Sequence, residues 1–248
     1  MNIGMYQSAA SLSALERWQD VVSQNITSAQ TTGYRKRTVQ FSTESAGEWR
    51  GERAGARGGL TEPAVFPKVA TGINYLSGET QTTRRELDVA IQGDGFFELR
   101  QPDGGLTYTR CGEFALRADR TLVAAGNAEV MTEDGSPIVL LPGGGPLVVN
   151  GDGTLMQGTT PLGRLALRQP ANPAALIPLS GGLFLAPAAA GMETVEHPEL
   201  MQGYLEQSNV SSLREMVDLV VIARAYEANQ RVIGAMDQQM QKSIEAFG

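Results

Sequence analysis

The chain has 248 residues, a hydrophobic content of 42% and a formal net charge of -7 at pH 7. That hydrophobic content is enough for one large domain or two ordinary ones with a real core, so disorder throughout is excluded. The acidic balance does not favour a nucleic-acid partner, and the short basic run Arg35-Lys36-Arg37 is interpreted as solvated surface. Cys111 is the only cysteine, which excludes an internal disulfide and a cysteine-built metal site.

The N-terminal region has neither the basic segment nor the apolar run of a cleaved signal peptide. No stretch approaches the roughly 18 uninterrupted apolar residues that a membrane-spanning helix needs. Neither Sec export nor membrane insertion is therefore expected.

Residues 5–29 have the pattern of a helix with one narrow apolar face. Steps of three and four residues from Met5 reach Leu12, Leu15, Val22 and Ile26. The polar segment that follows ends at Gly33, which is the expected stop of this helical region, residues 1–33. Asn25 lies beside the apolar face, where its amide would either bond to a neighbouring chain or face solvent.

The middle of the chain differs from the N-terminal region in composition and in the spacing of its apolar residues. Residues 34–69 are predicted to be an extended connector, flexible where glycine and alanine alternate with charges between Glu44 and Gly59. Residues 70–190 carry turn signals at intervals of about 8 to 12 residues, which predicts a central all-β domain with eight or more short strands. The clearest hairpin joins residues 96–100 to residues 106–110 through Asp103-Gly104. Residues 191–207 are predicted to be a second connector.

The C-terminal region, residues 208–248, repeats the pattern of the N-terminal region. The three-four stepping from Met216 passes through Leu219, Tyr226 and Ile233 and ends at Phe247. A narrow apolar face of this kind is typical of a helix that lies along another helix. A terminal helix packed on its own domain is the alternative. Because both ends share the pattern, we expect an α+β fold in which the terminal helices pair as an antiparallel coiled coil and the β domain is looped out between them.

The predicted assembly interface takes residues from both helices. Its members are Leu12, Leu15, Val22, Asn25, Ile26, Met216, Leu219, Ala223, Tyr226, Asn229, Ile233, Met240 and Ile244. The apolar residues Val217, Val220, Val221 and Ile222 are expected to be covered by neighbouring subunits. We expect both termini to be largely unfolded in the free monomer and to order on assembly.

No pattern in the sequence predicts an enzyme. His197 is the only histidine and lies beside Pro198 in a predicted connector, which removes a multi-histidine metal site and leaves a catalytic triad dependent on one residue. Acidic pairs such as Glu86 with Asp88 are common in a chain with 27 acids. Gly93-Asp94-Gly95 and the Gly143 to Gly145 run lack the rest of a nucleotide-binding motif. No catalytic residue, metal or cofactor is expected.

Five segments of the chain have the form of sequence motifs. They are Ser23 to Arg35, which ends in Thr-Gly-aromatic-basic, then Leu87 to Phe97, Tyr108 to Phe114, Gln202 to Val210 and Ala223 to Asn229. In this order they resemble the N-terminal motif, the two β-domain motifs and the two C-terminal motifs of the flagellar rod and hook family of bacterial axial proteins. Thr27 and Gln30 stand where the family usually has asparagine.

The resemblance implies a structural subunit of the flagellar basal-body rod, most like the proximal rod protein, because the insert at residues 44–80 is brief. A distal rod protein or another hook-basal-body axial protein is the alternative. The implied partners are other rod proteins, copies of the chain itself, the flagellar type III export apparatus and, as further candidates, the surrounding basal-body rings. The implied location is the rod in the periplasmic space, reached without a cleaved signal peptide. No nucleic acid or membrane insertion is implied.

Two other functions fit parts of the sequence. A carbohydrate-binding β-domain protein with a dimerising coiled coil predicts a discrete dimer and a pocket with paired carboxylates. A cytoplasmic coiled-coil adaptor is disfavoured because the two helical patterns lie at opposite ends of the chain.

Overall fold

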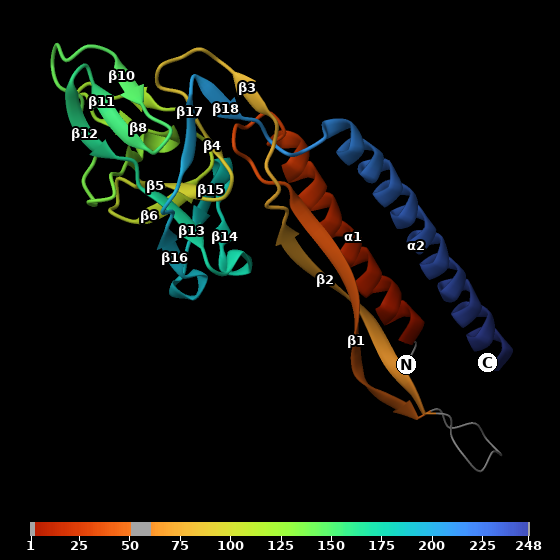
Figure 1. Cartoon of the computed structure of the whole chain (residues 1–248). Helices are drawn as coiled ribbons and strands as arrows, with labels where there is room; N and C mark the ends of the chain where they lie inside the picture. Colours follow the sequence, from red (N-terminus) through yellow and green to blue (C-terminus); the bar gives the residue numbers. More distant parts are fainter. Residues whose placement is uncertain (1–2, 51–60, 248) are drawn as a thin grey trace. The chain divides into compact units, whose positions relative to one another are not determined.

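The computed structural model describes residues 3–50 and 61–247 (Figure 1). The chain divides into two compact units. Unit 1 comprises residues 1–26, 37–72 and 211–248, and unit 2 comprises residues 27–36 and 73–210. Residues 51–60 of the predicted connector and the side chain of Phe247 lie outside what the structure describes.

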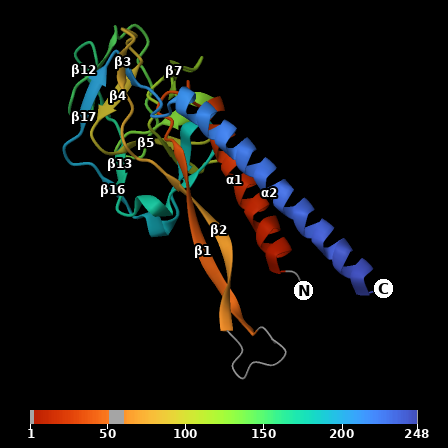
Figure 2. The same ribbon diagram turned by 90° about the vertical axis from the view of Figure 1, so that its right-hand side faces the viewer.

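Unit 1 contains both terminal helices, as the sequence predicted. The N-terminal helix α1 spans Ile3–Thr27 and the C-terminal helix α2 spans Ser212–Phe247. The end of α1 lies beside the start of α2, because Asn25 and Glu215 are hydrogen-bonded (Figure 2). Leu15, Val22 and Ile222 form a small buried cluster between the two helices. This contact uses only the first turns of α2, since the described side chains from Gly234 to Glu245 are exposed except for Met236.

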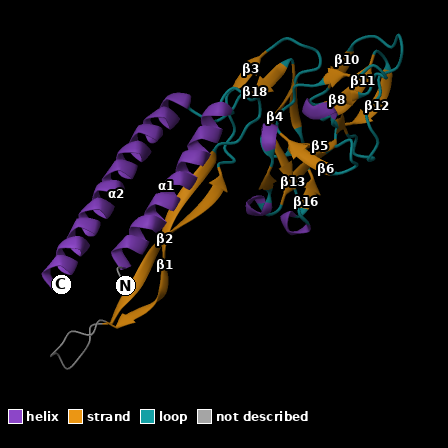
Figure 3. Cartoon of the chain, turned by 180° about the vertical axis from the view of Figure 1, so that it is seen from behind, coloured by secondary structure: helices purple, strands orange, loops and turns teal. Residues whose placement is uncertain are grey.

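Unit 1 also contains a hairpin that the sequence did not predict. Strands β1 (Arg37–Arg50) and β2 (Thr61–Ile73) form a two-stranded sheet where a flexible connector was expected. The sheet lies alongside α1 (Figure 3), with the rings of Trp18 and Phe41 edge to face at 5.5 Å and Gln7 donating a hydrogen bond to the Val65 carbonyl. Packing against α1 stabilises the two strands, because an isolated two-stranded hairpin is only marginally stable in water.

Unit 2 is rich in short strands. Its strands are β3 (Thr80–Thr82), β4 (Val89–Gln92), β5 (Phe96–Arg100), β6 (Leu106–Thr109), β7 (Ala115–Leu116), β8 (Leu122–Val123), β9 (Glu129–Val130), β10 (Leu147–Val149), β11 (Thr154–Gln157), β12 (Thr160–Arg164), β13 (Leu167–Pro170), β14 (Ile177–Pro178), β15 (Leu183–Leu185), β16 (Met192–Thr194), β17 (Glu199–Gln202) and β18 (Tyr204–Glu206). Short 3-10 helices occupy Ala125–Asn127, Pro173–Ala175, Ser180–Gly182 and Ala188–Ala190. The expectation of at least eight strands is confirmed.

The largest sheet of unit 2 has the order β14-β15-β6-β5-β9-β8-β7, with β13 pairing both β5 and β16. Smaller sheets join β10, β11 and β12, β17 with β4, and β18 with β3. The main core gathers around Phe97, Leu99, Phe114, Leu155 and Leu167, with the rings of Phe97 and Phe114 edge to face at 5.1 Å. Residues 191–207, expected to be a connector, instead contribute three strands, because their backbone pairs with strands from the middle of the chain.

The predicted hairpin is confirmed in detail. Strands β5 and β6 are antiparallel, with Phe97 opposite Thr109 and Arg100 opposite Leu106. Gly104 has a φ of 87°, and the Asp103 carboxylate accepts a hydrogen bond from the Gly105 amide at 2.9 Å. The Asp-Gly pair thus supplies the left-handed conformation that the turn requires. Within the described residues, neither helix is long and apolar enough to span a membrane.

Candidate assembly interface

Helix α2 has one apolar face that packs inside unit 1. Ile222 is buried at 2% exposure, and Leu219, Ala225 and Tyr226 are partly buried against the same cluster. These positions recur every three or four residues, so they form one stripe along the helix. The expectation that a neighbouring subunit covers Ile222 is therefore wrong, because α1 of the same chain covers it.

A second apolar face of α2 remains exposed. Leu213 is 76% exposed, Val217 56% and Val220 52%, and Met216 and Val221 are also exposed. With about 100° of rotation per residue, these five residues lie on the side of the helix opposite Ile222. We call Leu213, Met216, Val217, Val220 and Val221 the outer face. The first part of α2 is therefore apolar on two sides, which is typical of a helix covered by a partner on each side.

The structure divides the thirteen residues of the predicted interface. Leu15, Val22, Asn25, Ile26, Leu219 and Tyr226 face the interior of unit 1. Met216, Ala223, Met240 and Ile244 are exposed, and Leu12, Asn229 and Ile233 are intermediate. Val217, Val220 and Val221, which were expected to be covered by neighbouring subunits, are exposed in this chain, and so is Leu213, which the prediction did not include. The sequence signal for Leu213 was the i, i+3, i+4, i+7 spacing that it forms with Met216, Val217 and Val220.

Asn25 joins three elements of unit 1 through its buried amide. Its Nδ2 donates to the Arg37 carbonyl at 2.8 Å and to the Glu215 carboxylate at 2.9 Å, and its Oδ1 accepts from the Arg37 amide at 2.9 Å. The side chain is fully buried, and Glu215 is only 1% exposed. Asn25 therefore bonds within its own chain, and neither of the two expected placements, solvent or a neighbouring chain, is correct.

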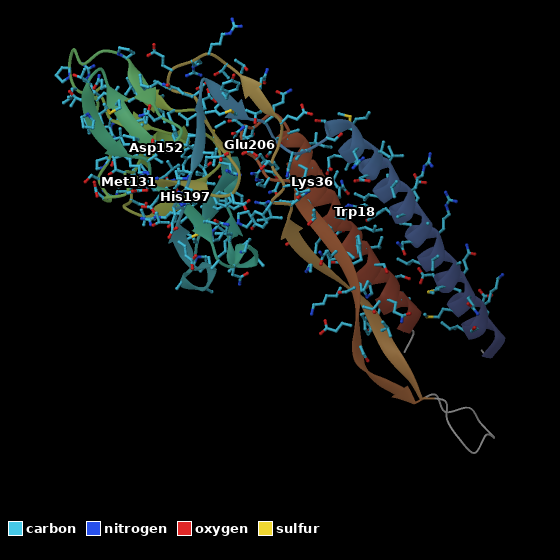
Figure 4. All side chains as sticks on the ribbon, in the orientation of Figure 1. Trp18, Lys36, Met131, Asp152, His197 and Glu206 are labelled. Carbon is cyan, nitrogen blue, oxygen red and sulfur yellow. The ribbon has the colours of Figure 1, made fainter. Side chains whose placement is uncertain are left out.

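A second polar cluster lies inside unit 2. Arg35 Nη1 contacts Glu206 Oε1 at 2.5 Å, and Arg110 Nε lies 3.4 Å from Glu206 Oε2. Glu206 Oε1 also accepts a hydrogen bond from the Gly78 amide at 2.8 Å. Figure 4 labels Glu206 at the end of β18. Arg35 is 2% exposed, so its interpretation as solvated surface is wrong. Nothing in the local sequence indicated this burial, because the partner Glu206 lies 171 residues further along the chain.

Asn209 fixes the neighbouring segments of unit 2. Its Oδ1 accepts a hydrogen bond from the Lys36 amide at 2.6 Å. Its Nδ2 donates to the carbonyls of Asn74 and Leu76 at 3.0 and 2.7 Å. One side chain thus holds three segments that are distant in sequence. Glu206 and Asn209 both belong to the C-terminal segment that carries the family resemblance, so part of that resemblance reflects internal structure.

Gly33 has a structural role different from the expected one. Helix α1 already ends at Thr27, and Gly33 donates its amide to the Glu206 carbonyl at 2.8 Å. Its φ is +67°, and a Cβ at this position would lie 2.4 Å from the backbone of Arg110 and Cys111. Glycine is required here because two backbone segments approach too closely for any side chain.

Replacing Gly33 with alanine is expected to destabilise unit 2 by about 2 to 4 kcal/mol, since the left-handed φ and the backbone clash act together. Gly93→Ala is the matched control, because Gly93 has a φ of +84° and open space where a Cβ would be. It should cost only about 1 kcal/mol. Urea unfolding of both variants measures the difference, and equal losses would show that the close approach contributes nothing.

No group of three or more histidine, cysteine, aspartate or glutamate side chains that could hold a metal occurs among the described residues. His197 is exposed (Figure 4). Cys111 is a free thiol whose Sγ lies 2.9 Å from the Thr32 hydroxyl. Asp88 is fully buried and lies 3.6 Å from Arg85, which also pairs with Glu113. These acids therefore serve ion pairs within unit 2.

Comparison with known proteins places these features in a family. The profile "Flagellar hook protein FlgE/F/G D1 domain" matches residues 90–157, and "Flagellar basal body rod FlgEFG protein C-terminal" matches residues 201–246. The flagellar basal-body rod protein FlgF of Caulobacter vibrioides is 29% identical over 248 residues, covering 100% of this chain and 99% of its own. FlgF of Rhizobium meliloti is 30% identical with the same coverage, and rod protein FlgG of Borreliella burgdorferi is 30% identical, covering 95% of each chain.

The apolar terminal helices, the strand-rich body and these matches define the class as flagellar axial proteins. The match to FlgF of Rhizobium meliloti extends over 100% of this chain and 99% of the relative, so it is not confined to one shared domain. The chain belongs to the flagellar basal-body rod protein family and is a structural subunit of the rod.

Proposed function

We propose that the chain assembles into the rod through the outer face of α2, which packs against helices of neighbouring axial subunits. The observation that carries this proposal is the exposure of five apolar side chains within the first three turns of one helix. Scattered single apolar residues are normal on protein surfaces, but a continuous stripe marks an interaction site. The neighbours are copies of this chain and other axial proteins.

In the assembled state the two terminal helices form an antiparallel coiled coil. The contact between Leu15, Val22 and Ile222 supports this pairing near the start of α2. The rest of α2 carries the exposed apolar side chains Val232, Met240 and Ile244, and subunit packing would cover them. The contacts of Leu15, Val22 and Asn25 with the start of α2 lie within one chain, so we restrict the expected unfolding of the free monomer to the part of α2 beyond Tyr226, which would order when neighbours arrive. Far-ultraviolet circular dichroism of the dilute monomer tests this, since an α2 that is helical to its end would contradict it.

The same proposal includes the location of the subunit and its other partners. The subunit reaches the periplasmic part of the basal body through the flagellar type III export apparatus, without a cleaved signal peptide, and contacts the surrounding rings there. The brief segment at residues 44–80 supports the proximal part of the rod, with a distal position as the alternative. The role is structural and not catalytic, in keeping with relatives named as rod proteins.

Replacing Val217 and Val221 together with aspartate is expected to abolish assembly. Two apolar contacts worth about 1.5 to 3 kcal/mol each are lost, and two charges would have to be buried, so the critical concentration should rise at least about 100-fold. Sedimentation velocity and electron microscopy of the purified protein over a concentration series measure this, and basal-body incorporation in a strain lacking the native protein measures it in the cell.

The control is Val148→Asp, because Val148 is an exposed valine of unit 2, at 42%, and lies on β10. It should assemble as the unmodified chain does. Loss of assembly in Val148→Asp alone would place the interface on unit 2 and contradict the proposal. A discrete dimer that never grows with concentration would contradict it as well.

A further inference from the structure

A pocket of about 130 Å³ in unit 2 has two buried arginines in its wall. Arg35 is 2% exposed and Arg110 is 3% exposed. Both face the same carboxylate, that of Glu206. Two guanidinium cations against one buried carboxylate leave one positive charge in excess among these buried groups, and the exposed Asp94, which lines the same pocket, offsets part of it.

The hydrogen bonding of the two arginines is also incomplete. Arg110 donates through Nη2 to the Gly93 carbonyl, but its Nη1 has no hydrogen-bond partner among the described residues, and neither has Nε of Arg35. Oε2 of Glu206 likewise has no hydrogen-bond partner among the described residues, although it lies 3.4 Å from Arg110 Nε, so the three groups do not fully satisfy one another. Buried donors are nearly always satisfied, so the two nitrogens are available to an acceptor from outside the chain. Burial lowers the pKa of Arg110 to about 10, which leaves the side chain charged at neutral pH.

The shape of the pocket limits what that acceptor is. Phe96, Pro170 and Pro173 supply apolar walls, and the volume suits a group of about four to six non-hydrogen atoms. Guanidinium groups pair best with planar carboxylates, which accept two parallel hydrogen bonds. A carboxylate with a short hydrocarbon part fits both the charge and the walls better than a fully polar phosphate.

We propose that this pocket binds a carboxylate group, supplied either by a small free monocarboxylate or by an acidic side chain of a neighbouring rod subunit. Asp94 also lines the pocket and is exposed. Its charge opposes an entering carboxylate, so Asp94 weakens the site without forming it. Removing that charge should tighten binding, an effect that a purely structural arginine cluster would not show.

The test is a titration of the ¹⁵N-labelled full chain with sodium acetate at constant ionic strength. Saturable shifts are expected at the amides of Gly93, Gly95 and Phe96, with little change at the Gly104 turn. Asp94→Asn should lower the dissociation constant about two- to five-fold, because one screened charge is removed from the mouth of the pocket. Asp103→Asn is the matched control and should leave it unchanged, since Asp103 is an exposed acid that does not line this pocket.

Shifts that spread over the surface without saturating, or an unchanged dissociation constant in Asp94→Asn, would overturn the proposal. Equal binding of inorganic phosphate would overturn the preference for carboxylate. Because these measurements use the unassembled chain, they stand or fall independently of the assembly proposal. The source is decided by adding acetate to the assembly assay: inhibition indicates a neighbour's carboxylate in the pocket, and no effect indicates a free anion.

Discussion

Replacing Glu206 with glutamine is expected to destabilise unit 2 by about 3 to 5 kcal/mol, the cost typical of removing one partner from a buried ion pair. Glu206 is 3% exposed and lies against Arg35 at 2.5 Å and Arg110 at 3.4 Å. The amide of glutamine keeps the size of the side chain but removes the negative charge. Two buried guanidinium groups would then repel each other with no counter-charge between them.

Urea unfolding followed by far-ultraviolet circular dichroism measures this loss. The matched control is Glu129→Gln, because Glu129 also pairs with an arginine, Arg117 at 2.9 Å, but both side chains are partly exposed. Solvent-screened pairs contribute about 0 to 1 kcal/mol, so this control should change little. If the two variants lose equal stability, burial of the Glu206 cluster does not contribute as argued.

Replacing Asn25 with alanine is expected to destabilise unit 1 by about 3 kcal/mol. The Asn25 amide is fully buried and hydrogen-bonded to Arg37 and Glu215. Its removal deprives the Arg37 carbonyl, the Arg37 backbone amide and the Glu215 carboxylate of one hydrogen bond each, at a place that water does not reach. Each unsatisfied buried group costs about 1 to 3 kcal/mol, and charged groups cost more. The loss should appear as looser packing of α1, β1 and α2 on one another.

Tryptophan fluorescence reports on this change, since Trp18 is packed against the helix cluster of unit 1. Gln24→Ala is the control, because Gln24 is the adjacent residue and also accepts a hydrogen bond from Arg37, at 2.6 Å, but in an exposed position. It should cost less than about 0.5 kcal/mol. A double-mutant cycle of Asn25→Ala with Glu215→Ala isolates the coupling, which should be about 1 to 3 kcal/mol. Strict additivity would show that the two residues act separately.

Local sequence was sufficient to predict those elements whose contacts join residues that are close together in the sequence. The hairpin of β5 and β6 followed from Asp103-Gly104 between two alternating segments, and both terminal helices followed from apolar periodicity. The hairpin of β1 and β2 could not be predicted in this way, because its strands depend on packing against α1, as the contact of Phe41 with Trp18 shows.

The buried polar residues depended on partners too distant for sequence reasoning. Arg35 stands in a basic run that looks solvated, and only the fold brings Glu206 to it across 171 positions. Asn25 and Glu215 are 190 positions apart. Three-four stepping along α2 could not separate the residues that pack inside unit 1, such as Leu219 and Tyr226, from those that stay exposed, such as Met216, because this separation depends on where α1 lies.

The division of the chain into units also sets the order in which they can fold. Unit 1 draws on three separated segments, the last of which starts at residue 211, whereas nearly all of unit 2 is one uninterrupted stretch. During synthesis, which proceeds from the N-terminus, unit 2 has all its strands available before α2 is complete. Closing unit 1 requires contacts across most of the chain, which are the slowest to form. Unit 2 can therefore fold before α2, which carries the exposed apolar outer face, is available to bind another subunit.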